Sequence, residues 1–319
     1  MAELSFGRIG VLMGGPSTER EISLKSGKAV YESLSQAGFE VSAIDIKTDG
    51  RDENIKLIES LGIDVAFIAL HGRFGEDGQI QEILDTLKIP YTGSGVKASR
   101  LAMDKIASRK IFEASGLSVP RYKTEEKVSY DSARERGFNG FVLPLVIKPA
   151  SHGSSIGLSI IEKEEYLDKA LELAFSFDER IIIEEYIRGR EVTVGILDEK
   201  FLPVIEIIPK KGFFDYEAKY HAGLTDYMVP AELPDEIAAR IQEAALSAHK
   251  LLGCCGCSRV DLIIDSSNTP FVLEVNTIPG MTATSLLPKA AKVAGIDFSR
   301  LCTKLIELAY EKTKIQPPG

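Results

Sequence analysis

Short apolar runs and longer amphipathic stretches alternate over the first hundred residues of the chain. Three of the runs have the length of β-strands: residues 8–13, 41–46 and 65–70. Residues 19–36 carry apolar side chains at helical spacing, Gly38 follows their end, and Thr18 and Glu21 have the spacing of a capping box. Strands that alternate with helices in this way predict a small parallel α/β domain.

The apolar pattern continues beyond residue 95. Helices are expected over 96–114, 237–252 and 298–310. Buried strands are expected over 144–149 and 181–183, and an apolar strand over 158–161. Residues 210–234 differ, because this stretch is polar, rich in aromatic residues and without a steady period. A loop of this length inside a compact protein is typically a lid or a binding element, so we expect a lid here.

Residues 258–276 have the pattern of a β-hairpin, with two apolar runs around the polar turn 265–270. If the strands close symmetrically on the turn, three pairs of residues lie opposite each other: Ile264 with Phe271, Asp261 with Glu274, and Arg259 with Asn276. Side chains alternate between the faces of a strand, so the polar members share one face. The apolar residues would share the other face: Val260, Leu262, Leu273 and Val275.

The polar face of this hairpin has the composition of a metal site. Asp261 and Glu274 would repel each other across the strand pair, and a cation between them removes that cost. Oxygen ligands from Asp261, Glu274 and Asn276 suit Mg²⁺ or Mn²⁺. The alternative is a solvated polar face, and a register shift of one residue would place the two carboxylates on opposite faces.

Two further segments could bind a nucleotide. Lys148 ends a predicted strand, and the glycine- and serine-rich turn 151–157 could close over phosphates with backbone and hydroxyl donors; the alternative is a flexible hairpin turn. Glu184 and Glu185 follow a buried strand, with Glu191 shortly beyond, and such carboxylates can accept hydrogen bonds from ribose hydroxyls. The alternative for these carboxylates is simple solvation.

The first turn of the chain argues against one class of enzyme. Residues 14–17 lack the GxGxxG pattern, and Pro16 removes a backbone donor, so a nicotinamide-dependent dehydrogenase is disfavoured. The same turn directs Glu19 toward the ends of the strands, where open α/β sheets bind ligands.

Arg259, beside the predicted metal face, could stabilise an oxyanion that develops during acyl transfer. The turn 276–282 leads to Ser285 and Leu286, and could present backbone N–H groups and a hydroxyl to a small carboxylate. Otherwise this segment is a Pro-Gly loop followed by the start of a helix.

Composition narrows the possible partners. The chain has 319 residues, 44% of them hydrophobic, and a net charge of −9, which argues against nucleic-acid and anionic-membrane partners. It has no apolar run of membrane-spanning length and no pattern of an export signal, so we expect a cytoplasmic protein. The four cysteines, three of them within 254–257, are expected to be buried free thiols, with a metal site as the alternative.

With these segments in order, the chain resembles the ATP-grasp carboxylate–amine ligases, and in particular the D-alanine–D-alanine ligase family, from about residue 9 to 310. The resemblance rests on eight blocks of sequence: Gly14-Gly15-Pro16-Ser17-Thr18-Glu19-Arg20-Glu21-Ile22-Ser23, His71-Gly72-x-x-Gly75-Glu76-Asp77-Gly78, Pro90-Tyr91-Thr92-Gly93-Ser94-Gly95, Met103-Asp104-Lys105, Lys148-Pro149-x-x-x-Gly153-Ser154-Ser155-x-Gly157, Asp215-Tyr216-Glu217-Ala218-Lys219-Tyr220, Arg259-Val260-Asp261, and Glu274-Val275-Asn276-Thr277-x-Pro279-Gly280-Met281-Thr282.

The resemblance implies roles for individual residues. The magnesium ligands are matched by Asp261, Glu274 and Asn276, and the ATP-binding residues by Lys105, Lys148, Glu184, Glu185, Ile187, Glu191 and Lys219. Glu19 matches the residue that holds the ammonium of the first D-alanine, in a hydrogen-bonded set with Ser154 and Tyr220. The oxyanion stabilisers and second-substrate contacts are matched by Arg259, the backbone of Gly280, Ser285, Leu286 and His71.

The implied fold is α/β (α+β): an ATP-grasp fold preceded by a small Rossmann-like parallel domain. The expected boundaries are 1–100 for the N-terminal domain, 101–190 for the central subdomain and 191–319 for the C-terminal subdomain. The implied reaction joins two D-alanines through an acylphosphate, for peptidoglycan precursor synthesis, and uses ATP with Mg²⁺ or Mn²⁺. Alternatives are a D-alanine–D-lactate ligase, another carboxylate–amine ligase, and a non-catalytic nucleotide-binding protein. We also expect a homodimer.

Overall fold

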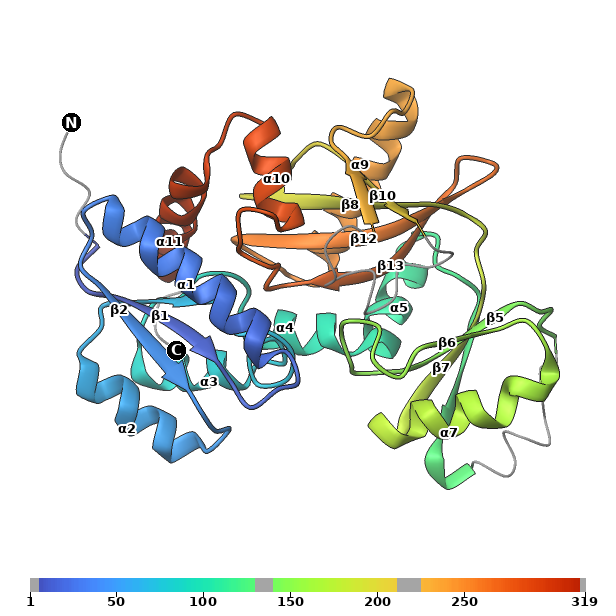
Figure 1. Ribbon diagram of the computed structural model, residues 1–319, viewed down its shortest axis with the longest axis horizontal. Coiled ribbons are helices and arrows are strands. Elements are labelled where there is room, and N and C mark those ends of the chain that lie inside the picture. The colour runs from blue at the N-terminus through green and yellow to red at the C-terminus, as the bar shows by residue number, and fades with distance from the viewer. Residues whose placement is uncertain (1–5, 130–139, 211–224, 316–319) are drawn as a thin grey trace.

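The structure, a computed structural model, describes residues 6–129, 140–210 and 225–315. Its first part is a parallel sheet of three strands in the order β2-β1-β3, flanked by helices (Figure 1). The elements of this part are β1 (Ile9–Gly14), α1 (Arg20–Gln36), β2 (Val41–Ile46), α2 (Arg51–Leu61), β3 (Val65–Ile68) and α3 (Gln79–Leu87). The prediction of a small parallel α/β domain is therefore confirmed.

The capping box predicted at the start of α1 is wrong. The N-cap residue is Glu19, one position later than Thr18, and its side chain makes no capping hydrogen bond. Instead, the Ser17 hydroxyl accepts a hydrogen bond from the Glu19 amide at 3.2 Å. The Glu19 carboxylate bonds to Ser154 in another part of the molecule, so a tertiary contact replaces the local cap.

The single helix expected over 96–114 is two helices, α4 (Val96–Met103) and α5 (Lys105–Ala114). Asp104 has an extended backbone, and its Oδ1 accepts hydrogen bonds from the amides of Ile106 and Ala107, both at 3.0 Å. An aspartate in this position starts a new helix because it satisfies amides that have no partner within the helix. The break turns α5 so that Lys105 begins it.

The next part is an antiparallel sheet of four strands in the order β4-β7-β5-β6, with a helix packed against it. The elements are β4 (Tyr122–Glu126), η1 (Lys127–Ser129), β5 (Leu145–Pro149), β6 (Ser159–Ile161), η2 (Glu164–Tyr166), α7 (Leu167–Phe177) and β7 (Arg180–Glu185). The glycine- and serine-rich turn thus joins two paired strands, β5 and β6, as expected.

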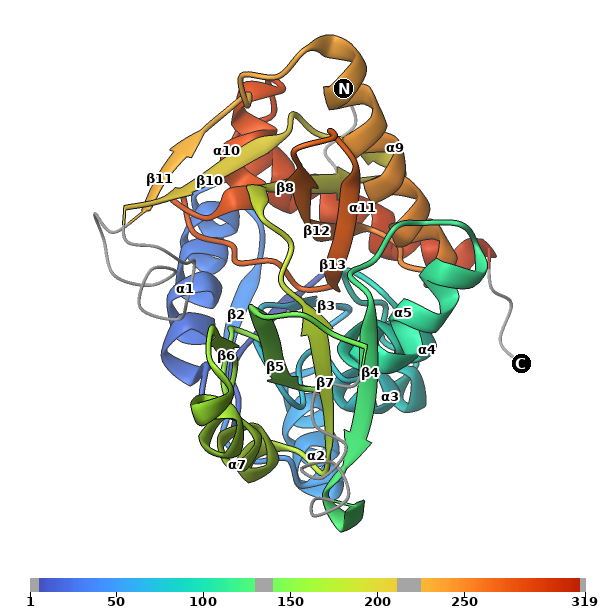
Figure 2. The ribbon, with the colours of Figure 1, turned by 90° about the vertical axis from the view of Figure 1, so that its right-hand side faces the viewer.

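The third part is a second antiparallel sheet, with strand order β11-β10-β8-β12-β13 and β9 paired to β8. Its elements are β8 (Gly189–Leu197), β9 (Lys200–Phe201), β10 (Ile205–Pro209), β11 (Thr225–Met228), α9 (Asp235–Leu251), β12 (Cys257–Asp265) and β13 (Pro270–Asn276). In Figures 1 and 2 this sheet lies above the four-stranded sheet. Strand β11 falls within 210–234, so the expectation of a continuous loop there is wrong; residues 211–224 of the predicted lid lie outside the described residues.

The chain ends with α10 (Leu286–Val293) and α11 (Phe298–Ile315). Helix α11 returns to the first part of the molecule and packs beside α1, where Leu301 and Leu305 share a core with Val30 and Leu34 (Figure 1). Within the described ranges, no helix is long and apolar enough to cross a membrane. The four cysteines are free thiols, and all but the half-buried Cys255 are buried, largely as expected.

Candidate active site

The hairpin of β12 and β13 has the predicted register at its polar end. Arg259 pairs with Asn276, and Asp261 pairs with Glu274. The two carboxylates are therefore opposed, as the sequence predicted.

The predicted closure of this hairpin is nevertheless wrong. Ile264 pairs with Pro270 rather than with Phe271, and the register shifts beyond Asp261, leaving Leu273 as an extra residue in β13. This β-bulge restores the register. It also changes the faces, because Val272 is fully buried in the core whereas Leu273 is half-buried and lines a cavity.

Side chains of the protein offset the repulsion between the opposed carboxylates. Arg259 donates from Nε and Nη2 to the two oxygens of Asp261, each at 2.8 Å. Lys105 Nζ lies 3.2 Å from Glu274 Oε2. Asn276 Oδ1 accepts a hydrogen bond from the Ile278 amide at 2.9 Å. The set contains only oxygen donors and only two carboxylates, which fits a hard cation that completes its shell with phosphate and water. Among the described residues, no cluster of three or more His, Cys, Asp or Glu side chains could hold a metal ion.

A cavity of about 320 Å³ lies between the two antiparallel sheets. Its lining includes six of the seven expected ATP-binding residues and two of the expected metal ligands, Asp261 and Glu274. The six are Lys105, Lys148, Glu184, Glu185, Ile187 and Glu191. Apolar side chains such as Val146, Ile160 and Leu262 supply the rest of its wall. A mostly apolar cavity with a few charged side chains suits a ligand that has a planar ring and a charged group.

Lys148 shares the buried carboxylate of Glu184 with an arginine from α5. Lys148 Nζ lies 2.8 Å from Glu184 Oε1, and Arg109, which is 0% exposed, forms an ion pair with Glu184 Oε2. Burial lowers the pKa of Lys148, which Glu184 partly offsets, to about 8. Burial alone would raise the pKa of Glu184, but the two cations outweigh burial and the net shift is downward.

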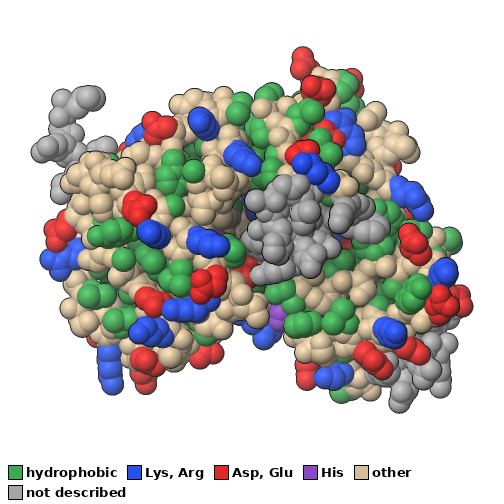
Figure 3. All heavy atoms as spheres, in the orientation of Figure 1, with side chains coloured by type: hydrophobic (Ala, Val, Ile, Leu, Met, Phe, Trp, Pro, Cys, Tyr) green, Lys and Arg blue, Asp and Glu red, His purple; other side chains and the backbone are tan. Residues whose placement is uncertain are grey.

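A second cavity, of about 610 Å³, lies beside the first. The residues expected to bind the amino acids line it together: Glu19, His71, Ser154, Arg259, Gly280, Ser285 and Leu286. Lys105 and Glu274 line both cavities, so the two spaces meet at the hairpin. In the space-filling view the molecular surface is hollowed between the N-terminal part and the four-stranded part (Figure 3).

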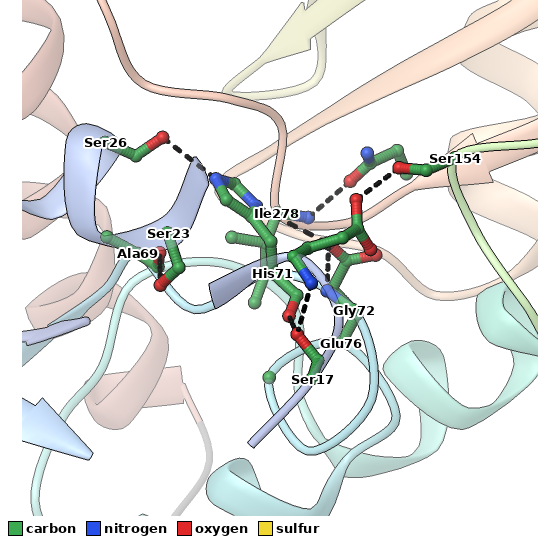
Figure 4. A network of polar contacts seen from close by, with 12 residues as sticks. Ser17, Ser23, Ser26, Ala69, His71, Gly72, Glu76, Ser154 and Ile278 are labelled. Atoms are coloured by element: carbon green, nitrogen blue, oxygen red, sulfur yellow. Dashed lines mark hydrogen bonds and ion pairs between the residues drawn. The ribbon is translucent and has the colours of Figure 1, made fainter. Parts of the chain in front are cut away.

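Loops from distant parts of the chain meet in the second cavity. The Ser154 hydroxyl donates to Glu19 Oε1, which joins the turn after β5 to the start of α1 (Figure 4). Ser285 Oγ accepts a hydrogen bond from the Thr282 amide at 3.1 Å. Two expected site residues, Lys219 and Tyr220, lie outside the described residues.

Sequence reasoning missed three polar residues that line these cavities or contact the residues lining them. Arg109 lies at helical spacing between the buried Ile106 and Phe112, so a charge on an apolar helix face was the available signal. Glu76 lies within one of the sequence blocks that carry the resemblance, yet no role was expected for it. Ser26 gave no signal, because a serine on the buried face of a helix is ordinary.

Comparisons with known proteins agree with this geometry. The family model described as D-ala D-ala ligase C-terminus matches residues 111–307, and the model of the N-terminus matches residues 8–61 and 53–94. A D-alanine–D-alanine ligase of Pelotomaculum thermopropionicum is 49% identical over 317 residues, covering 97% of this chain and 98% of the relative.

Solved structures of ligases are also similar to the chain. A D-alanine–D-alanine ligase from Bacillus anthracis, complexed with ATP, has a TM-score of 0.84 at 37% identity, covering 98% of this chain and 100% of that chain. The VanG D-Ala:D-Ser ligase from Enterococcus faecalis has a TM-score of 0.81 at 35% identity, covering 95% of this chain and 99% of that chain. The chain therefore belongs to the D-alanine–D-alanine ligase family and has its ATP-grasp fold.

Proposed function

We propose that the protein joins two molecules of D-alanine to D-alanyl-D-alanine, with conversion of ATP to ADP and phosphate, for peptidoglycan precursor synthesis. The observation that carries the proposal is the meeting of the two cavities at Lys105 and Glu274. A nucleotide in the smaller cavity would direct its phosphates toward that junction. An amino-acid carboxylate in the larger cavity would then lie within reach of the terminal phosphoryl group, as direct transfer requires.

We assign Asp261, Glu274 and Asn276 as the residues that would hold Mg²⁺ or Mn²⁺ at this junction. Asp261 pairs with Glu274 across two neighbouring strands, and Asn276 lies two residues beyond Glu274 on the same strand. Cationic side chains already neutralise both carboxylates. When bound there, the ion would offset charge on the phosphates during transfer. Lys105 and Lys148 would add positive charge beside it, each from a buried position.

The protein's own groups would then support attack on the acylphosphate. Glu19 is the group assigned to the first D-alanine's ammonium, and it is buried and bonded to Ser154. The amine of the second D-alanine attacks the acylphosphate carbonyl, and Arg259 and the Gly280 backbone would stabilise the tetrahedral oxyanion. Ser285, Leu286 and His71 would position the second D-alanine. Lys219 would bind ATP, and Tyr220 would join the hydrogen-bonded set of Glu19 and Ser154.

The second substrate is the part of this proposal that needs the sharpest test. A hydroxy acid such as D-lactate would give an ester, and one similar protein is named a D-Ala:D-Ser ligase. D-alanine is favoured because Tyr220 is retained, and tyrosine at this position accompanies peptide synthesis in the family that the sequence resembles.

The test is ATP turnover with D-alanine alone and with D-alanine plus D-serine or D-lactate, with products identified by mass. The expected result is D-alanine-dependent phosphate release with the dipeptide as the main product from pH 6 to 9. A mainly mixed product would assign the protein to another branch, and phosphate release independent of D-alanine would contradict ligase activity.

The homodimer and the cytoplasmic location remain predictions. Sedimentation would test the first, and cell fractionation would test the second.

A further inference from the structure

The hydroxyl of Ser26 lies behind the wall of the larger cavity and joins two of its parts. Ser26 is on α1 and is 0% exposed. Its Oγ lies 2.9 Å from His71 Nε2 (Figure 4). It also accepts a hydrogen bond from the Met281 amide at 3.3 Å. One buried hydroxyl thus connects the loop after β3 to the turn after β13.

These two contacts fix where the hydroxyl proton goes. The Met281 amide can only donate, so it occupies a lone pair of Ser26 Oγ. Within the described part of the chain, His71 Nε2 is the remaining hydrogen-bond partner recorded for this oxygen. A buried hydroxyl proton needs an acceptor, so Nε2 accepts it and carries no proton of its own.

The other ring nitrogen of His71 has surroundings that agree with this assignment. Nδ1 lies 3.5 Å from Glu76 Oε1, and the Gly72 amide donates to the same oxygen at 3.0 Å. A carboxylate that accepts from both groups requires the proton on Nδ1. The hydrogen bonds therefore run in one direction, from Met281 to Ser26 to Nε2 and from Nδ1 to Glu76.

We propose that Ser26 is a positioning residue for the second substrate. Its hydroxyl sets both the tautomer of His71 and the orientation of the Gly280–Met281 peptide. This inference rests on the proposed function, which places His71 beside the second D-alanine and the Gly280 backbone at the tetrahedral oxyanion formed by its attack. The Met281 amide belongs to the peptide that follows Gly280, so holding it restricts the backbone of Gly280 itself. Loss of the hydroxyl frees both groups at once.

The chain provides a matched control on the same helix. Ser23 is also 0% exposed, accepts a hydrogen bond from the Gly14 amide at 2.8 Å and donates to the Ala69 carbonyl at 2.8 Å. Like Ser26, it does not line either cavity. Ser23→Ala and Ser26→Ala therefore each remove a buried hydroxyl with two hydrogen bonds from α1, but only the second removes contacts to His71 and Met281.

Steady-state kinetics separates positioning from stability. Ser26→Ala should lower kcat about tenfold or more and raise the KM of the second D-alanine, because small displacements at a reacting centre slow the reaction strongly. The KM of ATP should stay unchanged. Ser23→Ala should lose comparable thermal stability and keep kcat within about twofold. Ser26→Thr, which keeps the hydroxyl, should recover kcat. Equal losses of kcat in the two alanine variants would overturn the proposal. It would also be overturned if Ser26→Ala raised the KM of ATP as much as the KM of the second D-alanine.

A spectroscopic measurement on the unaltered protein tests the tautomer directly. Long-range ¹⁵N–¹H correlation of histidine-labelled protein, with His71 assigned by its loss in His71→Gln, should show a protonated Nδ1 and an unprotonated Nε2. A protonated Nε2 would overturn the inference even if Ser26→Ala does not fold. Absence of dipeptide synthesis by the wild-type protein would instead count against the proposed function, and the tautomer result would be unaffected.

Discussion

The two cavities of this protein are built in different ways. The smaller cavity, which we propose binds the nucleotide, has its charged groups on strands and in buried ion pairs. An example is Glu184, which pairs with Lys148 and Arg109. The larger cavity, which we propose binds the amino acids and call the substrate cavity, is lined mainly by loops and helix starts. Hydrogen bonds connect its polar groups to residues far apart in the sequence. The bond between Ser26 and Met281, for example, spans 255 positions. Changes in the first cavity should therefore affect stability and ATP binding, and changes in the second should affect the use of D-alanine.

The hairpin between the cavities should show the largest effect, because both proposed half-reactions depend on it. Asp261→Asn or Glu274→Gln should lower turnover by about 10²–10³-fold, since each removes a carboxylate ligand of the ion that would offset charge on the phosphates during transfer. The fold should persist, because an amide of the same size can keep part of the hydrogen bonding. Turnover at several Mg²⁺ concentrations and circular dichroism are the measurements.

Glu206 is the matched control for Asp261. It lies in the same sheet and accepts two hydrogen bonds from Arg190, at 2.7 and 2.6 Å, outside both cavities. Glu206→Gln should keep turnover near that of the wild type. Near-normal turnover of Asp261→Asn at low Mg²⁺ would rule out the metal assignment.

Arg109→Met should destabilise the protein by about 3–5 kcal/mol, because it removes one partner of a buried ion pair. It should also weaken ATP binding, because Lys148 becomes the main cation beside Glu184. The neighbouring pair of Arg121 and Glu185 is 3.5 Å apart and largely exposed, so Arg121→Met should cost at most about 1 kcal/mol. Urea unfolding measures both. Equal costs for the two variants would contradict the structural role of the buried pair.

The contrast between the cavities also explains what could be predicted from sequence. Strand alternation placed Asp261 opposite Glu274, and the structure has this pair. The count succeeded although the hairpin closes differently, because the bulge at Leu273 restored the register. Bulges and helix breaks depend on single residues, so the break at Asp104 and the bulge escaped a reading based on periodicity.

The hydrogen bonds in the wall of the substrate cavity could not be predicted from periodicity for a different reason. Ser26, His71 and Met281 belong to three segments that no local pattern connects. Glu19 is different, because the family resemblance, and not a local pattern, paired it with Ser154, 135 positions away, and the two residues are hydrogen-bonded. Local periodicity alone does not name the partners of residues that act through tertiary contacts.

Gly280→Ala should raise the KM of the second D-alanine about tenfold, with little change for ATP. A Cβ atom at this position would lie 2.9 Å from Ser285 Oγ, so the Ser285 hydroxyl must move away from Thr282. If Ser285 transmits the effect, the double variant with Ser285→Ala should be no worse than the more impaired single variant. Additive losses in this cycle would show that the glycine acts independently of Ser285.

The smallest effect concerns the pH dependence of ATP binding. Burial lowers the pKa of Lys148 to about 8, so the free protein loses this charge as the pH rises through 8. Phosphate favours the charged lysine, so binding above pH 8 must be accompanied by proton uptake. The Kd of ATP should therefore be constant from pH 6.5 to 7.5 and rise about fivefold between pH 8 and 9. Calorimetry in buffers of different ionisation enthalpy measures both the Kd and the proton uptake.

This trend opposes the chemistry of the second substrate, which allows the two cavities to be separated in one pH series. The attacking amine of D-alanine must lose a proton, so kcat should rise with pH over the range in which the Kd of ATP rises. Lys148→Arg keeps its charge at every pH in the series, so its Kd of ATP should stay constant while its kcat still rises. A wild-type Kd that does not change up to pH 9.5 would show that Lys148 remains charged in the free protein, and that Glu184 offsets burial more completely than the pKa of about 8 implies.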